Sequence, residues 1–97
     1  MPDSLNQNTI VVASRKQISS DLKGETAILS LDKGVYYGLS DVGTSVWKLL
    51  QTPVSIAEIH SALSKEYDVE ESILKEDIFN LLKRLNAEGL VEFTSNR

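Results

Sequence analysis

The sequence predicts an α+β protein in which strands near the amino terminus precede three helices. Two extended segments, Thr26–Leu31 and Val35–Leu39, are joined by the polar turn Asp32-Lys33-Gly34, which is typical of a hairpin. Beyond residue 40, apolar residues recur at helical spacing in three successive segments, and an extended tail follows the last of them. Three helices with such a tail, the second and third closely linked, are the pattern of a winged-helix or helix-turn-helix module.

The first strand is expected at Thr9–Ala13, because its three central residues are β-branched and polar residues flank them. We expect this strand to pair with one of the hairpin strands. The next segment, Ser14–Lys23, has only Ile18 and Leu22 as apolar anchors. It is therefore expected to be a connection that is pinned to the core at these two points.

The second hairpin strand is expected to lie at the edge of a small sheet. Period-two alternation places Val35, Tyr37 and Leu39 on one face, which we expect to meet the helices. Tyr36 and Gly38 lie on the opposite face, and Gly38 leaves room for another backbone to approach closely. An edge strand presents unpaired backbone groups to another chain.

The first two helices have clear start and stop signals. The first is expected to begin after a capping residue, Ser40 or Asp41, and to stop at Thr52-Pro53. The second begins with Ser55 and Glu58 at capping-box spacing. Their inward positions are Val42, Val46, Trp47, Leu49 and Leu50 in the first helix, then Ile56, Ile59 and Leu63 in the second.

The third helix is expected from about Glu70 to Glu88, and Gly89 is suited to end it. Its apolar positions follow the helical pattern and are Ile73, Leu74, Ile78, Leu81, Leu82 and Leu85. Three basic residues stand against five acidic ones between Glu70 and Glu88, so this helix has a net charge of −2. A recognition helix of that sign would repel DNA phosphates, which argues against a nucleic-acid partner.

Composition is that of one globular domain, expected over residues 1–97 with an ordered core of about residues 9–93. The net charge of −4 disfavours a polyanionic partner. There is no cysteine, no export signal and no apolar run near the ~20 residues that cross a bilayer. We therefore expect a cytoplasmic protein without disulfides, thiolate metal sites or a membrane partner.

Residue types for catalysis are not found in any recognisable arrangement. His60 is the only imidazole and is interpreted as a half-exposed helical residue. The acidic residues between Asp68 and Asp77 are interpreted as charges near a helix N-terminus. The glycines lack phosphate-loop spacing. No catalytic residue, metal site or cofactor is expected, and the protein is not expected to be an enzyme.

An open strand beside a helix is suited to peptide capture, in which an extended ligand adds a strand to the sheet. We expect the ligand to pair with Val35–Leu39 and to place apolar side chains near Leu74, Ile78 and Leu81. The alternative is that these three residues are only core, which is the preferred interpretation for Leu82 and Leu85.

An ordered set of short motifs extends over nearly the whole chain, from about Thr9 to Phe93. In chain order the set is Gly24-Glu25-Thr26, Gly34-Val35-Tyr36-Tyr37-Gly38-Leu39, Val42-Gly43, Val46-Trp47, Leu49-Leu50, Ile56 with Ile59, Asp77 with Leu82 and Leu85, and Gly89-Leu90. With this set the chain resembles the recognition elements that bind precursors of ribosomally made, modified peptides, similar to the D protein of pyrroloquinoline quinone biosynthesis. Its length, tyrosine-rich second hairpin strand and Val46-Trp47 pair look most like free-standing leader-binding proteins of lasso-peptide biosynthesis.

This resemblance implies a three-stranded antiparallel sheet packed on a three-helix winged helix-turn-helix module. It implies that the leader of a precursor peptide pairs with the third strand and packs on the third helix. It also implies a partner that processes the leader, which in the lasso case is a separate cysteine protease and otherwise another modifying enzyme. By position, the pairing edge would be Val35, Tyr36, Tyr37, Gly38 and Leu39, and the helix wall would be Asp77, Ile78, Leu81 and Arg84. Asp77 is either a partner for a leader side chain or a solvated carboxylate.

The predicted function is therefore that of a non-enzymatic adaptor that binds a leader peptide and presents it to a processing enzyme. A winged-helix DNA-binding regulator is the main alternative, and a scaffolding subunit without peptide affinity is a third. The leader motif, the pairing register, the surface for the partner enzyme and the oligomeric state stay open at this stage.

Overall fold

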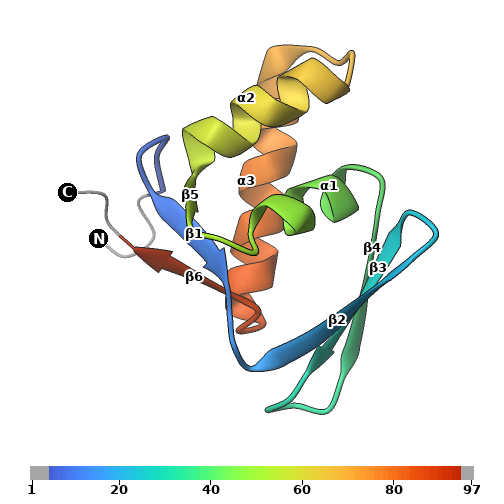
Figure 1. Cartoon of the computed structure of the whole chain (residues 1–97). Coiled ribbons are helices and arrows are strands. Elements are labelled where there is room, and N and C mark those ends of the chain that lie inside the picture. Colours follow the sequence, from blue (N-terminus) through green and yellow to red (C-terminus); the bar gives the residue numbers. More distant parts are fainter. Residues whose placement is uncertain (1–4, 95–97) are drawn as a thin grey trace.

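The computed structural model describes residues 5–94 and shows two three-stranded antiparallel sheets with three helices (Figure 1). One sheet has the order β5-β1-β6 and the other the order β2-β3-β4. The α+β class is confirmed, whereas the single sheet that we expected is wrong. In chain order the elements are β1 Ile10–Ala13, β2 Gln17–Leu22, β3 Glu25–Ser30, β4 Tyr36–Ser40, α1 Val42–Leu49, β5 Val54–Ser55, α2 Ile56–Glu66, α3 Glu71–Ala87 and β6 Val91–Thr94.

The expected connection Ser14–Lys23 instead contains the strand β2, which pairs with β3 along its full length. Lys23 and Gly24 both have positive φ, 56° and 85°, as a two-residue hairpin turn requires. Ile18 and Leu22 are 58% and 60% exposed, so they do not anchor this segment to the core. This strand could not be predicted from the sequence, because its mostly polar residues lack the alternation of apolar and polar side chains that is typical of a half-buried strand.

The strand β1 also has different partners from those expected. It lies between β5 and β6 and pairs with both in antiparallel fashion, while the hairpin strands form the other sheet. Val11, at its centre, is completely buried and pairs with Val54 and Phe93. The two-residue strand β5 was too short to be predicted from a pattern.

Helix signals in the sequence are largely confirmed. In the capping box of α2, the Ser55 N–H donates to Glu58 Oε1 at 2.8 Å and the Glu58 N–H donates to Ser55 Oγ at 3.1 Å. Gly89, with a φ of 77°, follows the end of α3, and Leu90 N–H donates to Leu85 O at 2.9 Å. Asp41 precedes α1 but makes no capping hydrogen bond with its side chain.

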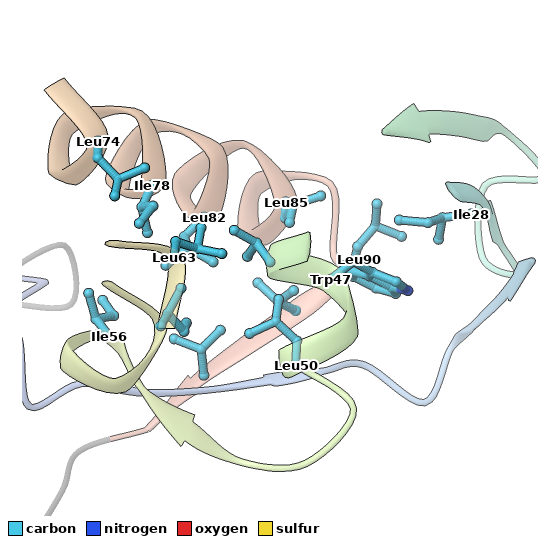
Figure 2. Packing of buried hydrophobic residues seen from close by; sticks show 14 residues of the cluster. Ile28, Trp47, Leu50, Ile56, Leu63, Leu74, Ile78, Leu82, Leu85 and Leu90 are labelled. Carbon is cyan, nitrogen blue, oxygen red and sulfur yellow. The ribbon is translucent and has the colours of Figure 1, made fainter. Parts of the chain in front are cut away.

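One core joins the helices to both sheets (Figure 2). Figure 2 shows the four buried residues of α3, Leu74, Ile78, Leu82 and Leu85, along the face of the helix that meets this core. Ile73 was expected with them but is 51% exposed. The fourteen core residues are Val11, Ile28, Val46, Trp47, Leu50, Ile56, Ile59, Leu63, Leu74, Ile78, Leu82, Leu85, Leu90 and Val91.

The β2-β3-β4 sheet extends to one side, beyond the helices (Figure 1). Its inner face contributes Ile28 to the core and packs on α1. Among the helices of residues 5–94, none is both long and apolar enough to cross a membrane.

Candidate functional site

Two adjoining hollows lie between β4 and the carboxyl-terminal half of α3. Both are lined by Gly38 and Leu39 from β4 and by Leu81 and Arg84 from α3, so together they form one groove. We call it the β4–α3 groove. The first hollow adds Tyr36, Tyr37, Leu85, Glu88 and Leu90, and the second adds Val42, Gly43, Asp77 and Asn80.

The backbone of β4 is available along this groove. In the described part of the chain β4 pairs only with β3 and forms one edge of its sheet. The Ser30 N–H donates to Val35 O at 2.9 Å, and the same register continues into β4. Because bonding to a neighbour alternates along an antiparallel strand, Tyr36 and Gly38 direct their N–H and C=O groups toward the open edge. A further strand can therefore pair with these two residues.

The floor of the groove is apolar and its rim is charged. Leu85 and Leu90 are 4% and 1% exposed, and Leu81 is half-buried beside them. On the rim, Asp77 and Arg84 are exposed. The side chains of a strand added to β4 would alternate between this floor and the outer face of the sheet.

One end of the groove is fixed by α1. Thr44 Oγ1 donates to Leu39 O at 3.0 Å, and Thr26 Oγ1 donates to Thr44 Oγ1 at 3.2 Å. A Cβ on Gly43 would lie 3.3 Å from the Leu39 side chain, so glycine allows α1 to approach β4 closely. These two threonines were missed in the sequence because an isolated hydroxyl gives no pattern.

The other end is closed by a carboxylate. Glu88 Oε1 accepts hydrogen bonds from Tyr37 OH at 2.6 Å and from Lys33 Nζ at 2.9 Å. The bond from Tyr37, and then that from Lys33, holds the pKa of the Glu88 carboxyl below its usual value. The same carboxylate raises the pKa of the Tyr37 phenol and of the Lys33 ammonium by hydrogen bonding. Glu88 was interpreted in the sequence only as the end of a helix.

The predicted site residues divide into two groups. Tyr36, Tyr37, Gly38, Leu39, Asp77, Leu81 and Arg84 all line the groove. Val35 precedes β4, is 46% exposed and lines neither hollow. Leu74, expected near the apolar side chains of the ligand, and Ile78, expected in the helix wall, are in the core and only 2% and 1% exposed, so both positions are corrected. Leu74 and Ile78 therefore lie on a different face of α3 from Leu81, whereas Leu85 belongs to the core and also lines the groove.

His60 differs from its interpretation as a half-exposed residue, since it is only 8% exposed. Its Nε2 lies 4.0 Å from Glu71 Oε2 and has no hydrogen-bond partner. Within residues 5–94, no three His, Asp or Glu side chains come close enough together to hold a metal ion.

Comparison with known proteins identifies the family. Residues 25–91 match the model of coenzyme PQQ synthesis protein D, PqqD. The chain belongs to the PqqD family. The matched region runs from β3 into β6 and includes all of the β4–α3 groove. A comparison with curated proteins gave no significant match.

Two solved structures of similar proteins share this fold. One is described as TbiB1 in complex with the TbiA(beta) leader peptide; it has 29% identity and a TM-score of 0.80, over 88% of this chain and 99% of that chain. The other is described as lasso peptide synthetase B1 complexed with the leader peptide; it has 22% identity and a TM-score of 0.74, over 84% of this chain and 96% of that chain. The PqqD resemblance is thereby confirmed, and the chain shares its fold with two proteins whose structures contain a leader peptide.

Proposed function

We propose that this protein binds the leader segment of a precursor peptide, in the biosynthesis of a ribosomally made modified peptide such as a lasso peptide, by adding the leader as a strand to β4. The observation that carries this proposal is the open β4 edge, with the unpaired backbone of Tyr36 and Gly38 beside an apolar floor on α3. Family membership and the leader-bound state of two similar structures support it.

The backbone alone cannot supply useful affinity. Tyr36 and Gly38 offer four polar groups, and four hydrogen bonds at ~1 kcal/mol net give ~4 kcal/mol. Micromolar binding requires ~8 kcal/mol after ~2–5 kcal/mol has been spent on ordering the peptide. At ~1.5–3 kcal/mol for each buried apolar side chain, about three side chains of the leader must reach the groove. The floor around Leu81 is the surface that receives them.

Polar groups on the rim are suited to fix the register of the bound strand. Asp77, Asn80 and Arg84 line the same hollow and are exposed. We propose that Asp77 accepts a hydrogen bond or pairs with a positive charge of the leader. The alternative, a solvated carboxylate, predicts that Asp77→Asn leaves leader affinity unchanged.

We further propose that the adaptor presents the leader to a separate processing enzyme, in the lasso case a cysteine protease, and has no catalytic role of its own. The outer face of the β2-β3-β4 sheet is the surface suited to that enzyme. Ile18, Leu29 and Tyr36 are cross-strand neighbours on this face, and Ile18 and Tyr36 are 58% and 71% exposed. A strand added to β4 would extend the same face, so an enzyme docked there would contact adaptor and leader together.

DNA binding is the alternative function. It would require the three helices and the extended tail to act as a winged helix-turn-helix module, an assignment that stays a prediction. The acidic side chains of α3 oppose it, because they would face phosphates in the groove of a duplex. Leader binding is also the function that agrees with the expected cytoplasmic location, where a precursor is translated.

The leader hypothesis is tested by a fluorescence-anisotropy titration with the labelled leader segment of the nearest-encoded short peptide. A peptide of the precursor core alone and a DNA duplex serve as controls. We expect saturation at micromolar concentration or below with the leader only. Duplex binding that weakens with salt, without leader binding, would support the regulator instead.

The groove is tested with Leu81→Glu, which places a charge on the apolar floor. Ile73→Glu is the matched control, because it also replaces an apolar residue of α3 by glutamate, at an exposed position outside the groove. We expect Leu81→Glu to reduce leader affinity at least ~30-fold, through loss of apolar contact and burial of an unpaired charge. Equal affinity in the two variants would contradict the proposed groove.

Presentation is tested with Ile18→Ser on the outer face. We expect unchanged leader affinity but slower leader removal by the purified protease, because only the enzyme contact is lost. A variant that supports normal rates of leader removal over a range of enzyme concentrations would argue against this docking surface.

A further inference from the structure

Three side chains from separate segments meet on one oxygen atom at the end of the β4–α3 groove. Tyr37 comes from β4, Lys33 from the turn before it, and Glu88 from the carboxyl end of α3. We call these three residues the Glu88 clasp. Glu88 Oε1 accepts from both partners, at 2.6 Å from the phenol and 2.9 Å from the ammonium.

The two donors contribute differently. Lys33 and Glu88 have side chains that are 49% and 42% exposed, and an ion pair with this exposure is screened and stabilises little. The Tyr37 bond is shorter and partly buried, and it reaches a charged acceptor. The phenol is therefore the main link of the clasp.

The clasp joins two parts of the molecule that otherwise stand apart along the groove. Among the hydrogen bonds of residues 5–94, those to Glu88 are the ones that tie the β2-β3-β4 sheet to α3. At the opposite end, the sheet is held by α1 through the Thr44 bond to Leu39. β4 is thus held at one end by the bond to α1 and tied to the end of α3 at the other by the clasp, with the open edge and the apolar floor between them.

We propose that the Glu88 clasp sets the width of the groove and that Tyr37 and Glu88 are positioning residues for the bound leader. This inference rests on the proposed leader-binding function. A leader strand must contact the β4 backbone and the α3 floor at once, so it binds only when their separation is correct. Loss of the clasp lets β4 move away from α3. Leader affinity then falls in proportion to the fraction of molecules in which the groove keeps the correct width.

The state of the clasp depends on the groups that face Glu88, which are the Tyr37 phenol and the positive charges of Lys33 and Arg84. It is intact while the Glu88 carboxyl is ionised and the Tyr37 phenol is protonated. Leader affinity should therefore be flat around neutral pH and fall when acid protonates Glu88. Glu88→Gln removes this acid-side change, whereas a purely structural defect would leave the shape of the profile as it was.

The experiment compares Tyr37→Phe, Glu88→Gln and their double variant with Tyr67→Phe. Tyr67 is the matched control, because its phenol also makes one partly buried contact, to Ser45 Oγ at 2.9 Å, and it lines neither hollow of the groove. Leader affinity is measured by anisotropy and groove opening by amide hydrogen exchange in the free protein. Thermal unfolding verifies that each variant is folded.

We expect each clasp variant to weaken leader binding by roughly 3- to 10-fold and the double variant to be no weaker than the worse single one, because both remove one interaction. Exchange should rise in β3 and β4 but not in β1 and β6, and Tyr67→Phe should bind as the wild type does. Leader affinities within about twofold of wild type would overturn the inference, even if exchange rises. A wild-type protein that binds no leader would overturn the proposed function as well. Faster exchange in the clasp variants would then show only that the clasp stabilises the structure.

Discussion

Leu81 and Leu82 are adjacent leucines whose truncation should have opposite consequences. Leu82 is completely buried, whereas Leu81 is half-buried and lines both hollows of the groove. Leu82→Ala leaves a cavity in the core and should cost ~2–5 kcal/mol of unfolding free energy. This is a large part of the ~5–15 kcal/mol typical of a domain. A loss of ~3 kcal/mol lowers the Tm of a domain of this size by roughly 12–24 °C.

Leu81→Ala removes the same atoms from a surface that is already open to water. We expect a stability loss of about 1 kcal/mol or less, since only part of the side chain is buried. Its main effect should be on binding, with leader affinity reduced ~5- to 30-fold. Leu82→Ala, measured well below its Tm, should bind the leader nearly as the wild type does.

The assay combines thermal unfolding followed by circular dichroism with anisotropy titration of the leader. The decisive quantity is the loss of stability compared with the loss of leader affinity in each variant. If Leu81→Ala destabilises the protein as much as Leu82→Ala and leaves leader affinity unchanged, then Leu81 is core and the floor of the groove is wrongly placed.

Three further predictions, which use four substitutions, test the surrounding structure. Ser55→Ala should lower the unfolding free energy by ~1 kcal/mol, because it removes the hydrogen bond to the Glu58 N–H; a urea titration measures this loss. Gly34→Ala should cost ~1–2 kcal/mol, because the φ of Gly34 is 65°, whereas Gly38→Ala, where an added Cβ meets open space, should cost less than half as much in the same assay. The pKa of Glu88 is lowered in the folded state, so the stabilisation by its carboxylate is present above the unfolded pKa and is lost as pH falls through the folded pKa. The stability difference between wild type and Glu88→Gln should therefore shrink as acid protonates this carboxylate, and a difference that stays constant from neutral to acidic pH would contradict its role.

The parts of the fold that were predictable are those with a local physical signal. The capping box at Ser55, the turn at Gly34 and the helix end at Gly89 each require particular residue types, and all three are present in the structure. Strand pairing was less predictable. The partners of β1 come from β5 and β6, far along the chain, and pairing between such distant segments leaves no local signature.

β2 shows a second limit of pattern reasoning. Its apolar residues Ile18 and Leu22 were expected to pin the segment to the core, because they are the only apolar anchors between Ser14 and Lys23. In the structure they stand on the outer face of a sheet that extends beyond the helices. An exposed apolar residue of this kind cannot be distinguished from a core residue by its type alone.

The same ambiguity explains the division within α3. Leu74, Ile78, Leu82 and Leu85 form the core stripe, and Asp77, Leu81, Arg84 and Glu88 form the groove stripe one position away. Both stripes follow helical spacing, so an apolar residue such as Leu81 would suit either of them. The two stripes differ in the residues one turn before and one turn after Leu81, which are the charged residues Asp77 and Arg84. A buried stripe would not contain charged residues without partners. The charges that flank a leucine on its own helix face, rather than the leucine itself, are therefore the sequence signal for the groove.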